Sequence, residues 1–160
     1  MPVGVIRRVN ISNIVSSSKS SLTCSMIAGI PNHRIEDIKL TNILCQHAGG
    51  GTKIDAGRHL EEEEKEYPEP TMFGNTPAHG FFIRHAEGIE VRNCKVIAST
   101  KDARPCFVLN DAERIEFSNI KADQSSGAPL FILDGAKAIK IEKCNSLPDT
   151  EIAATKHEEL

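Results

Sequence analysis

The chain has 160 residues, 39% of them hydrophobic, which is enough apolar surface for one continuous core. Its formal net charge of -3 argues against the broad basic surface that non-specific binding to nucleic acid requires. No apolar run approaches the roughly 20 residues of a membrane span, so we expect neither a nucleic acid nor a membrane as partner. No basic segment followed by an apolar stretch opens the chain, so no secretion signal is visible and the residues alone leave the localisation unknown.

One short apolar pattern recurs five times along the chain. In chain order, the copies are IRRVNISNIVS from Ile6, IEDIKLTNILC from Ile35, AEGIEVRNCKV from Ala86, AERIEFSNIKA from Ala112 and AKAIKIEKCNS from Ala136. A second apolar segment precedes each of the last three copies: GFFIRHA, CFVLNDA and LFILDGA. The step from Ile115 to Phe117 has the two-residue period of a strand rather than the period of a helix. We therefore predict short β-strands, at least two of them in each later repeat.

Alignment of the copies places apolar residues in common columns. One such column holds Val9, Ile38, Ile89, Ile115 and Ile139. Equivalent positions lie 24 to 29 residues apart, except between Ile38 and Ile89, where the interval is 51 residues. Periods of this size are typical of solenoids, and the longer interval predicts an inserted loop over residues 47–77.

Asparagine recurs at one turn position of the repeat. It occupies this position in four copies and lysine replaces it in the fifth: Asn13, Asn42, Asn93, Asn119 and Lys143. In a stack with strands roughly 4.8 Å apart, each side-chain amide can bond the amides above and below it. We predict such a ladder; the alternative is that these asparagines are turn residues without mutual contact.

Leucine-rich repeats are the competing solenoid, because their apolar pattern and period are similar. Their asparagine falls three residues after the third apolar position, whereas Asn42 follows Leu40 by two. The extra strand before each later copy also replaces the helical or irregular back of those repeats. We therefore predict an all-β fold: a right-handed parallel β-helix of about five to six coils over residues 1–146, truncated at its N-terminal side.

The two ends of the predicted stack differ. The first coil starts abruptly at VGVIRRV with no amphipathic segment to cover it, and an exposed strand edge invites pairing with another chain. Self-association through this N-terminal β edge is therefore an expected interaction. At the other end, we expect residues 147–160 to form a capping tail, in which a turn leads into a short helix with Asp149 or Thr150 as its N-cap.

The cysteines show no spacing that is typical of disulfide or metal chemistry. They are Cys24, Cys45, Cys94, Cys106 and Cys144. No Cys-x-x-Cys pair occurs among them, and two of them occupy an apolar column of the repeat. We therefore expect small buried side chains, with no disulfide framework and no metal site.

Five segments carry a combined signal of a known family. They are IAGIPNHRIEDIKLTNI from Ile27, GGG from Gly49, YPEPTMFG from Tyr67, GFFIRHAEGI from Gly80 and DARPCFVLNDA from Asp102. In this combination they resemble the late coils of glycoside hydrolase family 28, the polygalacturonase and rhamnogalacturonase relatives, over about residues 3–122. The resemblance implies a pectic oligosaccharide or polysaccharide as partner, no cofactor, and a secreted or periplasmic location.

The resemblance also implies inverting hydrolysis of α-linked galacturonan or related pectic sugars, with aspartates as general acid and base across a trapped water. Family members hold these aspartates in an Asn-Thr-Asp motif and an adjacent Asp-Asp pair. None of the seven aspartates of this chain neighbours another aspartate, and no Asn-Thr-Asp occurs. We therefore assign no catalytic residue and expect this chain alone to be inactive, because the family's catalytic coils precede the part that it resembles.

Three residues at the family's site positions are candidates for sugar contact: His79, Asp102 and Arg104, with Ser125 and Ser126 at the equivalent place in the next repeat. Arg104 is suited to pair a uronate carboxylate through two parallel hydrogen bonds. A salt bridge between Arg104 and Asp102 explains the same residues equally well, and His79 fits an ordinary loop histidine.

The inserted loop offers three further candidates. Tyr67, Glu69 and Phe73 could supply sugar stacking and hydrogen bonding from a functional lip or flap. The sequence thus predicts the C-terminal part of a pectin-type glycoside hydrolase with its catalytic aspartates missing from this chain. The alternative is a noncatalytic carbohydrate-binding or structural β-helix module.

Overall fold

A computed structural model describes residues 3–20, 23–69, 71–125, 127–145 and 147–160. Its elements are β1 (Arg7–Ser17), β2 (Ser25–Ala28), β3 (Ile35–His47), α1 (Lys53–Ala56), β4 (Phe81–Ala98), β5 (Phe107–Ala122), β6 (Phe131–Cys144) and β7 (Thr150–Glu159). The strands form one sheet in the order β1-β3-β4-β5-β6-β7, with β2 beside the first part of β4. All pairs are parallel except β6 with β7, and the sheet does not close on itself. The prediction of an all-β fold is therefore confirmed.

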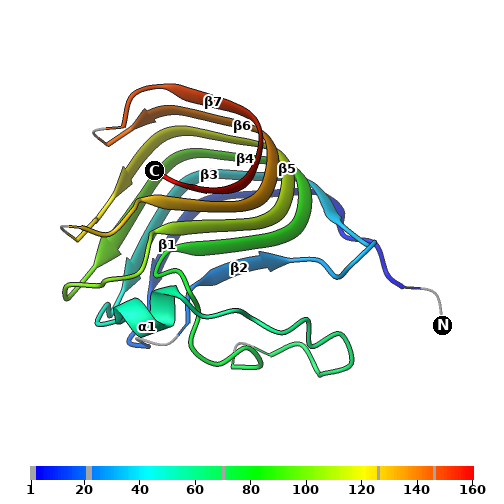
Figure 1. The fold of residues 1–160 in the computed structure, drawn as a ribbon, viewed down its shortest axis with the longest axis horizontal. Helices are drawn as coiled ribbons and strands as arrows, with labels where there is room; N and C mark the ends of the chain where they lie inside the picture. The colour runs from blue at the N-terminus through cyan, green and yellow to red at the C-terminus, as the bar shows by residue number, and fades with distance from the viewer. Residues whose placement is uncertain (1–2, 21–22, 70, 126, 146) are drawn as a thin grey trace.

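The repeats stack one above another, as nested arches in Figure 1. Hydrogen-bonded neighbours on successive strands are the residues that the sequence alignment placed in one column: Val9, Ile38, Ile89, Ile115 and Ile139. Ile89 and Ile115 have no exposed surface. The alignment of the copies is therefore confirmed residue by residue, and its apolar columns form the core.

The two apolar segments of each later repeat form one long bent strand rather than two separate strands. Residues with positive φ interrupt the backbone hydrogen bonding between strands at three corners. They are His85, Asp111 and Gly135 at the first corner, Asp37, Gly88, Arg114 and Ala138 at the second, and the asparagine column at the third. A single left-handed residue turns the backbone without ending the pairing on either side of it. Asparagine tolerates this conformation better than most residues, so its recurrence at the third corner has a local physical cause.

The predicted asparagine ladder is confirmed. Asn42 Nδ2 donates to Asn13 Oδ1 at 3.0 Å, Asn93 Nδ2 to Asn42 Oδ1 at 3.2 Å, and Asn119 Nδ2 to Asn93 Oδ1 at 2.7 Å. The side chains lie on the outside of the third corner. The ladder thus ties four strands together at a position where the apolar core does not reach.

A column of phenylalanines stacks inside the arches. The Phe81 and Phe107 ring centroids are 5.8 Å apart and those of Phe107 and Phe131 are 4.8 Å apart, with interplanar angles of 11° and 15°. Phe117 meets Phe107 and Phe131 edge-on at 5.0 and 4.9 Å. These contacts fill the interior beside β4, β5 and β6.

The C-terminal tail is a strand, so the predicted short helix at Asp149 or Thr150 is wrong. β7 runs antiparallel to β6 and pairs Ile152 with Ile139 and Thr150 with Ile141. The backbone groups at the free edge of β6 need hydrogen-bond partners, and its inward side chains need to be covered. A strand meets both needs, whereas a helix would only cover the side chains. This tertiary demand outweighs the weak helix preference of the tail.

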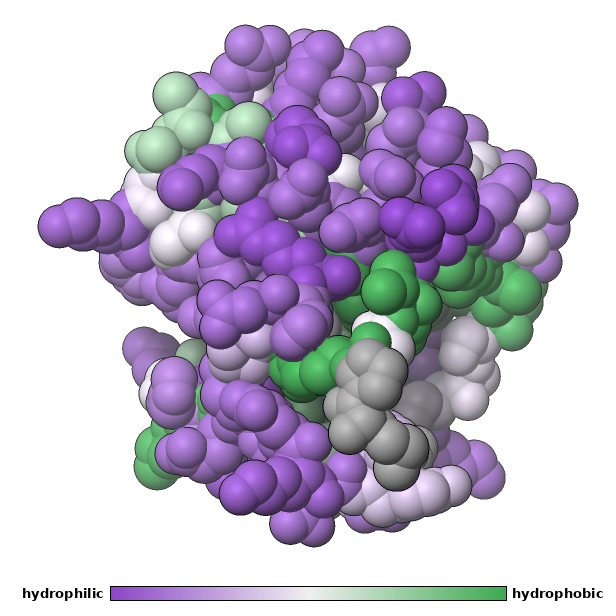
Figure 2. All heavy atoms as spheres, turned by 90° about the vertical axis from the view of Figure 1, so that its right-hand side faces the viewer, coloured by the Kyte–Doolittle hydropathy of each residue, from purple (hydrophilic) through white to green (hydrophobic). Residues whose placement is uncertain are grey.

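The opposite edge of the sheet is open. Within the described residues, no strand pairs with the second edge of β1, and Ile14 and Val15 are 41% and 79% exposed. An apolar hollow of about 520 Å³ opens there between β1, β2 and β3. Figure 2, which faces the side that carries the N-terminus, shows hydrophobic residues in a band across a hydrophilic surface. Self-association through this edge stays a prediction.

Among the described residues, no helix has the length and apolar content needed to cross a membrane. All five cysteines are free; four are buried and Cys24 is half-buried. The expectation of small buried side chains is therefore confirmed for Cys45, Cys94, Cys106 and Cys144.

The ladder predicts a stability difference between two substitutions at the same corner. Asn93→Gly keeps the left-handed backbone accessible but removes two amide hydrogen bonds, so we expect the free energy of unfolding to fall by about 1–2 kcal/mol. Lys143→Gly is the matched control, since Lys143 has a similar φ but no ladder partner, and we expect a change below about 0.5 kcal/mol. Urea unfolding measures both values, and equal losses would contradict an energetic role for the ladder.

Candidate functional site

A polar hollow, the rim cavity, lies where the turns after β4 and β5 meet the start of the inserted loop. Its volume is about 640 Å³, and His79, Asp102 and Gly51 line its inner side. The outer walls carry Ser99, Thr100 and Lys101 after β4, and Asp123, Gln124 and Ser125 after β5. The in-register stacking of β4 on β5 places these two turns side by side. Ser126 lies outside the described residues.

Asp102 and Arg104 form a buried, fully bonded pair at this cavity, with exposures of 3% and 2%. Arg104 Nε donates to Asp102 Oδ1 at 2.9 Å and Arg104 Nη2 donates to Oδ2 at 2.7 Å. The backbone amides of Arg104 and Gly51 donate to the same carboxylate, each at 2.9 Å. Arg104 Nη1 also reaches the Thr76 carbonyl at 3.3 Å. Arg104, which sequence analysis suggested as a partner for a uronate carboxylate, is therefore paired with a carboxylate of its own chain.

This pairing has consequences for chemistry at the rim cavity. Burial raises the pKa of Asp102, but the hydrogen bonds from Arg104 and Gly51 outweigh burial and hold this pKa below its ordinary value. An ionised carboxylate with four donors has no proton to give, so Asp102 is unsuited to act as a general acid. Gly51 packs against the pair so closely that a Cβ there would lie 2.0 Å from Arg104 Nε. The GGG segment thus includes one position where only glycine fits.

His79 lines the rim cavity, and a second buried histidine, His47, lies near it. His79, 2% exposed, donates from Nε2 to the Asp123 carbonyl at 3.1 Å, while its Nδ1 and both ring nitrogens of His47 have no hydrogen-bond partner among the described residues. Burial lowers the pKa of both histidines, and the neighbouring Arg104 lowers it further. His47 ends β3, and sequence reasoning had placed it at the edge of the inserted loop without a role.

The three loop candidates do not join this group. Tyr67 is 82% exposed and lies beside Glu69 in a shallow depression at the far part of the loop. Phe73 is half-buried, and its ring lies 5.4 Å from the Arg84 guanidinium carbon. The six candidates therefore occupy three places: His79, Asp102 and Arg104 are together, Tyr67 and Glu69 are together elsewhere, and Phe73 packs against Arg84.

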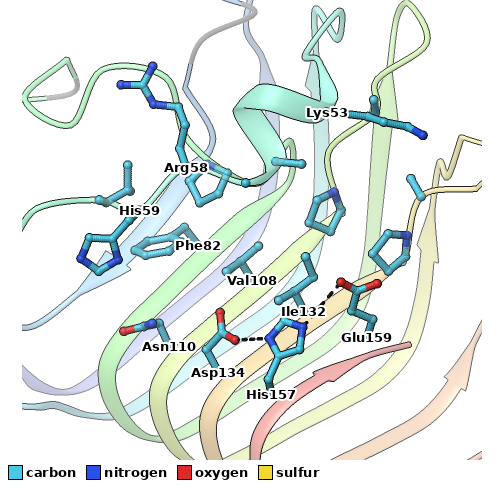
Figure 3. Close-up of a pocket in the computed structure, with 18 of the residues that line it drawn as sticks. Lys53, Arg58, His59, Phe82, Val108, Asn110, Ile132, Asp134, His157 and Glu159 are labelled. Carbon is cyan, nitrogen blue, oxygen red and sulfur yellow. Dashed lines mark hydrogen bonds and ion pairs between the residues drawn. The ribbon is translucent and has the colours of Figure 1, made fainter.

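A second hollow, the loop cavity, was missed by sequence reasoning. It has a volume of about 570 Å³ and lies between the inserted loop and the outer faces of β4, β5 and β6 (Figure 3). Phe82, Val108 and Ile132 are hydrogen-bonded neighbours that point outward from successive strands and form its floor. The rim cavity adjoins it, because Ala103 lines both hollows.

Arg84 holds the loop in place over this floor. Its Nη1 donates to the Leu60 carbonyl at 2.7 Å and its Nη2 to the Glu61 carbonyl at 3.0 Å. The ring nitrogens of the next residue, His85, contact Asp111 at 2.7 Å and Glu62 at 3.0 Å. The loop wall of the cavity is therefore anchored to the strands by buried polar contacts.

An aspartate, a histidine and a glutamate gather at the opposite wall. His157 of β7 donates from Nδ1 to Asp134 Oδ1 of β6 at 2.5 Å, and its Nε2 lies 3.5 Å from Glu159 Oε1. The hydrogen bond to Asp134 raises the pKa of His157. Figure 3 shows the imidazole between the two carboxylates. Sequence analysis could have found this group only by predicting that the C-terminal tail pairs antiparallel with β6.

The carboxylates of Asp102, Asp134 and Glu159 are engaged with other groups of the chain. Acid and base catalysis of glycoside hydrolysis needs two carboxyl groups that face each other across the scissile bond. Asp102 is enclosed by donors, and Asp134 and Glu159 flank a histidine. Hydroxyl, amide and charged side chains around the rim cavity instead offer donors and acceptors to a polar ligand. Among the described residues, no group of three or more His, Cys, Asp or Glu side chains could hold a metal ion.

Comparison with known proteins yields little. No family model matches the chain, and no curated protein matches it. Among solved structures, the chain is similar to a crystal structure from Parabacteroides merdae ATCC 43184 that carries the name "putative glycosyl hydrolase". The identity is 12%, the TM-score is 0.44, and the alignment covers 89% of this chain and 68% of that chain. A similarity this low supports no inference about fold or activity.

The buried histidines predict a loss of stability at mildly acidic pH. Their pKa is lowered by folding, so the unfolded chain binds protons first as the pH falls below about 6.5. The free energy of unfolding should therefore decrease between about pH 6.5 and pH 5, by about 1.4 kcal/mol for each unit of pKa lowering. His47 is the residue to replace, because its ring nitrogens have no hydrogen-bond partner in the part of the chain that the structure describes. The variant His47→Leu should flatten this decrease in urea titrations. An unchanged slope in His47→Leu would contradict the buried-neutral assignment.

The contact between β6 and β7 predicts a specific titration. Asp134→Asn removes the negative charge next to His157, so the pKa of His157 should fall toward about 6.5, the ordinary value of a histidine. Imidazole resonances followed by NMR against pH report this value directly. Glu151→Gln on the same strand is the control and should leave it unchanged. A His157 pKa that is insensitive to Asp134→Asn would contradict the pairing.

Proposed function

We propose that this chain is a carbohydrate-binding part of a pectin-type glycoside hydrolase that does not cleave glycosidic bonds by itself. In this proposal, the stacked strands are coils of a right-handed parallel β-helix, and pectic saccharides bind along the two adjoining hollows. The observation that carries it is the rim cavity, where polar side chains from successive repeats line one edge of the stack at the positions that the family resemblance assigns to the substrate.

Three features support the β-helix as the finer description of the fold. The strands are parallel and in register from β1 to β6, the same three corners recur in successive strands, and an asparagine ladder joins one corner. The resemblance to glycoside hydrolase family 28 rests on the sequence segments alone.

A noncatalytic carbohydrate-binding module is the second candidate. The enclosed Asp102 favours it, because this buried carboxylate at the rim cavity is bonded to Arg104 and Gly51 and serves the fold. Both candidates predict binding without turnover by this chain. They differ in whether a second polypeptide segment with paired aspartates restores hydrolysis.

The proposal predicts binding of oligogalacturonides without release of reducing ends. Calorimetry should show binding of a hexagalacturonate, and NMR should place the largest amide shifts in residues 99–103 and 123–125. Gln124→Ala should weaken binding about 2- to 10-fold, the effect of one lost polar contact. Lys95→Ala, on the strand arm beyond the asparagine corner, is the control. Absence of binding would contradict the proposed function, and hydrolysis by this chain alone would contradict the missing catalytic centre.

A further inference from the structure

The apolar columns of the core end uncovered at β1. Ile11 and Ile14 line the hollow between β1, β2 and β3, and each is 41% exposed. Their neighbours on β3, Leu40 and Ile43, are each 6% exposed. The difference arises because β3 lies between β1 and β4, whereas no described strand lies beyond β1. The hollow therefore lacks the layer of side chains that every later repeat receives from its neighbour.

The two edge strands of the sheet, β1 and β7 (Figure 1), differ in charge. Charged side chains on an edge strand oppose its pairing with another chain. Five titratable side chains occupy β7: Glu151, Lys156, His157, Glu158 and Glu159. By contrast, β1 has no charged residue from Val9 to Ser17. The edge at β1 is therefore the one that lacks protection against a second strand.

The apolar residues of β1 are spaced symmetrically about Asn10. Val9 and Ile11 lie one residue before and after it, and Ile6 and Ile14 lie four residues before and after it. All four apolar side chains line the hollow. In an antiparallel pair, residues directly opposite each other point to the same face of the sheet. Two β1 strands that pair with Asn10 opposite Asn10 therefore place Val9 opposite Ile11 and Ile6 opposite Ile14.

This symmetric register is distinguished from its neighbours by side-chain direction. With Asn10 opposite Ile11 instead, Val9 would lie opposite Ser12, which does not line the hollow. The symmetric register also keeps like charges apart, because Arg8 lies opposite Ser12. The hollow thus fits an identical hollow in one particular alignment of the two strands.

The other end of the stack shows that an antiparallel strand can follow the bends of an arch. There, β7 pairs antiparallel with β6 from Ile132 to Ile141. Within this paired stretch β6 bends with positive φ at Ala138, as β1 does at Arg8. The bent shape of β1 is therefore compatible with an antiparallel partner strand.

The area at this end is sufficient for a weak dimer. The two strands beside the hollow, β1 and β2, have 11 and 4 residues. With a rise of about 3.3 Å per residue and a sheet about 10 Å thick, they present about 500 Å² on each copy, or about 1,000 Å² in total. This total lies at the lower limit for a specific interface, so we expect a dissociation constant in the micromolar range.

We propose that two copies of this chain form a two-fold dimer through β1, with the two strands antiparallel and the two Asn10 residues opposite each other. In the dimer, the two apolar hollows face each other and form one continuous core. Both copies use the same surface, so the association closes at two. The dimer goes beyond the proposed function and does not depend on whether either cavity binds a saccharide.

The first experiment measures association of the 160-residue chain by sedimentation velocity. Between about 1 and about 500 µM, we expect a monomer–dimer equilibrium and no larger species. I11K places a charge in the hollow and should raise the dissociation constant at least about tenfold. I54K is the matched control, because Ile54 is 83% exposed on α1 and does not line the hollow. Far-ultraviolet circular dichroism and the unfolding midpoint establish that each variant is folded.

The second experiment tests the register by cross-linking with oxidised glutathione. Residues directly opposite each other have Cα atoms about 4.5–5.5 Å apart, within the range of a disulfide, so N10C should form a covalent dimer. S12C is the control on the same strand, since its two copies lie roughly 13 Å apart along the strand in this register. The native chain, whose five cysteines are free, gives the background of the reaction.

Four results would overturn the proposal. They are a monomer at every concentration, a dimer that I11K does not weaken, cross-linking of S12C but not of N10C, and a mass that keeps rising with concentration. The last result would indicate that β1 stacks on β7 of a further copy. No saccharide is present in either experiment, so each of these results leaves the proposed function standing.

Discussion

The fold depends on parallel strands that stack with similar apolar residues above one another. Each apolar column is buried only because a matching side chain lies on the strand before and the strand after, so a register shift of one residue would turn every such side chain outward. The asparagine ladder and the phenylalanine column act on the same register from the outside and the inside of the arches. This constraint also places equivalent turns side by side, which is what creates the rim cavity.

The columns of the core could be predicted from sequence because the repeat itself records which residues are neighbours. The corner geometry could be predicted only in part: asparagine marks one corner, but Arg114 and Ala138 adopt positive φ at another without belonging to a residue type that indicates it. The tail could not be predicted, since its strand conformation comes from pairing with β6 rather than from its own residues.

The same distinction explains the candidate site. His79, Asp102 and Ser125 come together because they occupy equivalent places in successive repeats, and sequence reasoning could find them. Whether Arg104 faces a ligand or Asp102 depends on side-chain direction and on the approach of Gly51, which no repeat encodes. The loop cavity needs the path of the inserted loop and the return of β7, and both are contacts between segments without sequence similarity.

Because β7 runs antiparallel to β6, the two ends of the stack differ. At β1, the exposed edge presents the same orientation, spacing and corner asparagine as the strands behind it, so another parallel strand would continue the pattern there. At β7, the backbone runs in the opposite direction and no corner asparagine is present, so a strand added there would not repeat the parallel, ladder-joined pattern. The parallel stack thus ends in a reversed strand at β7 and in an exposed edge at β1.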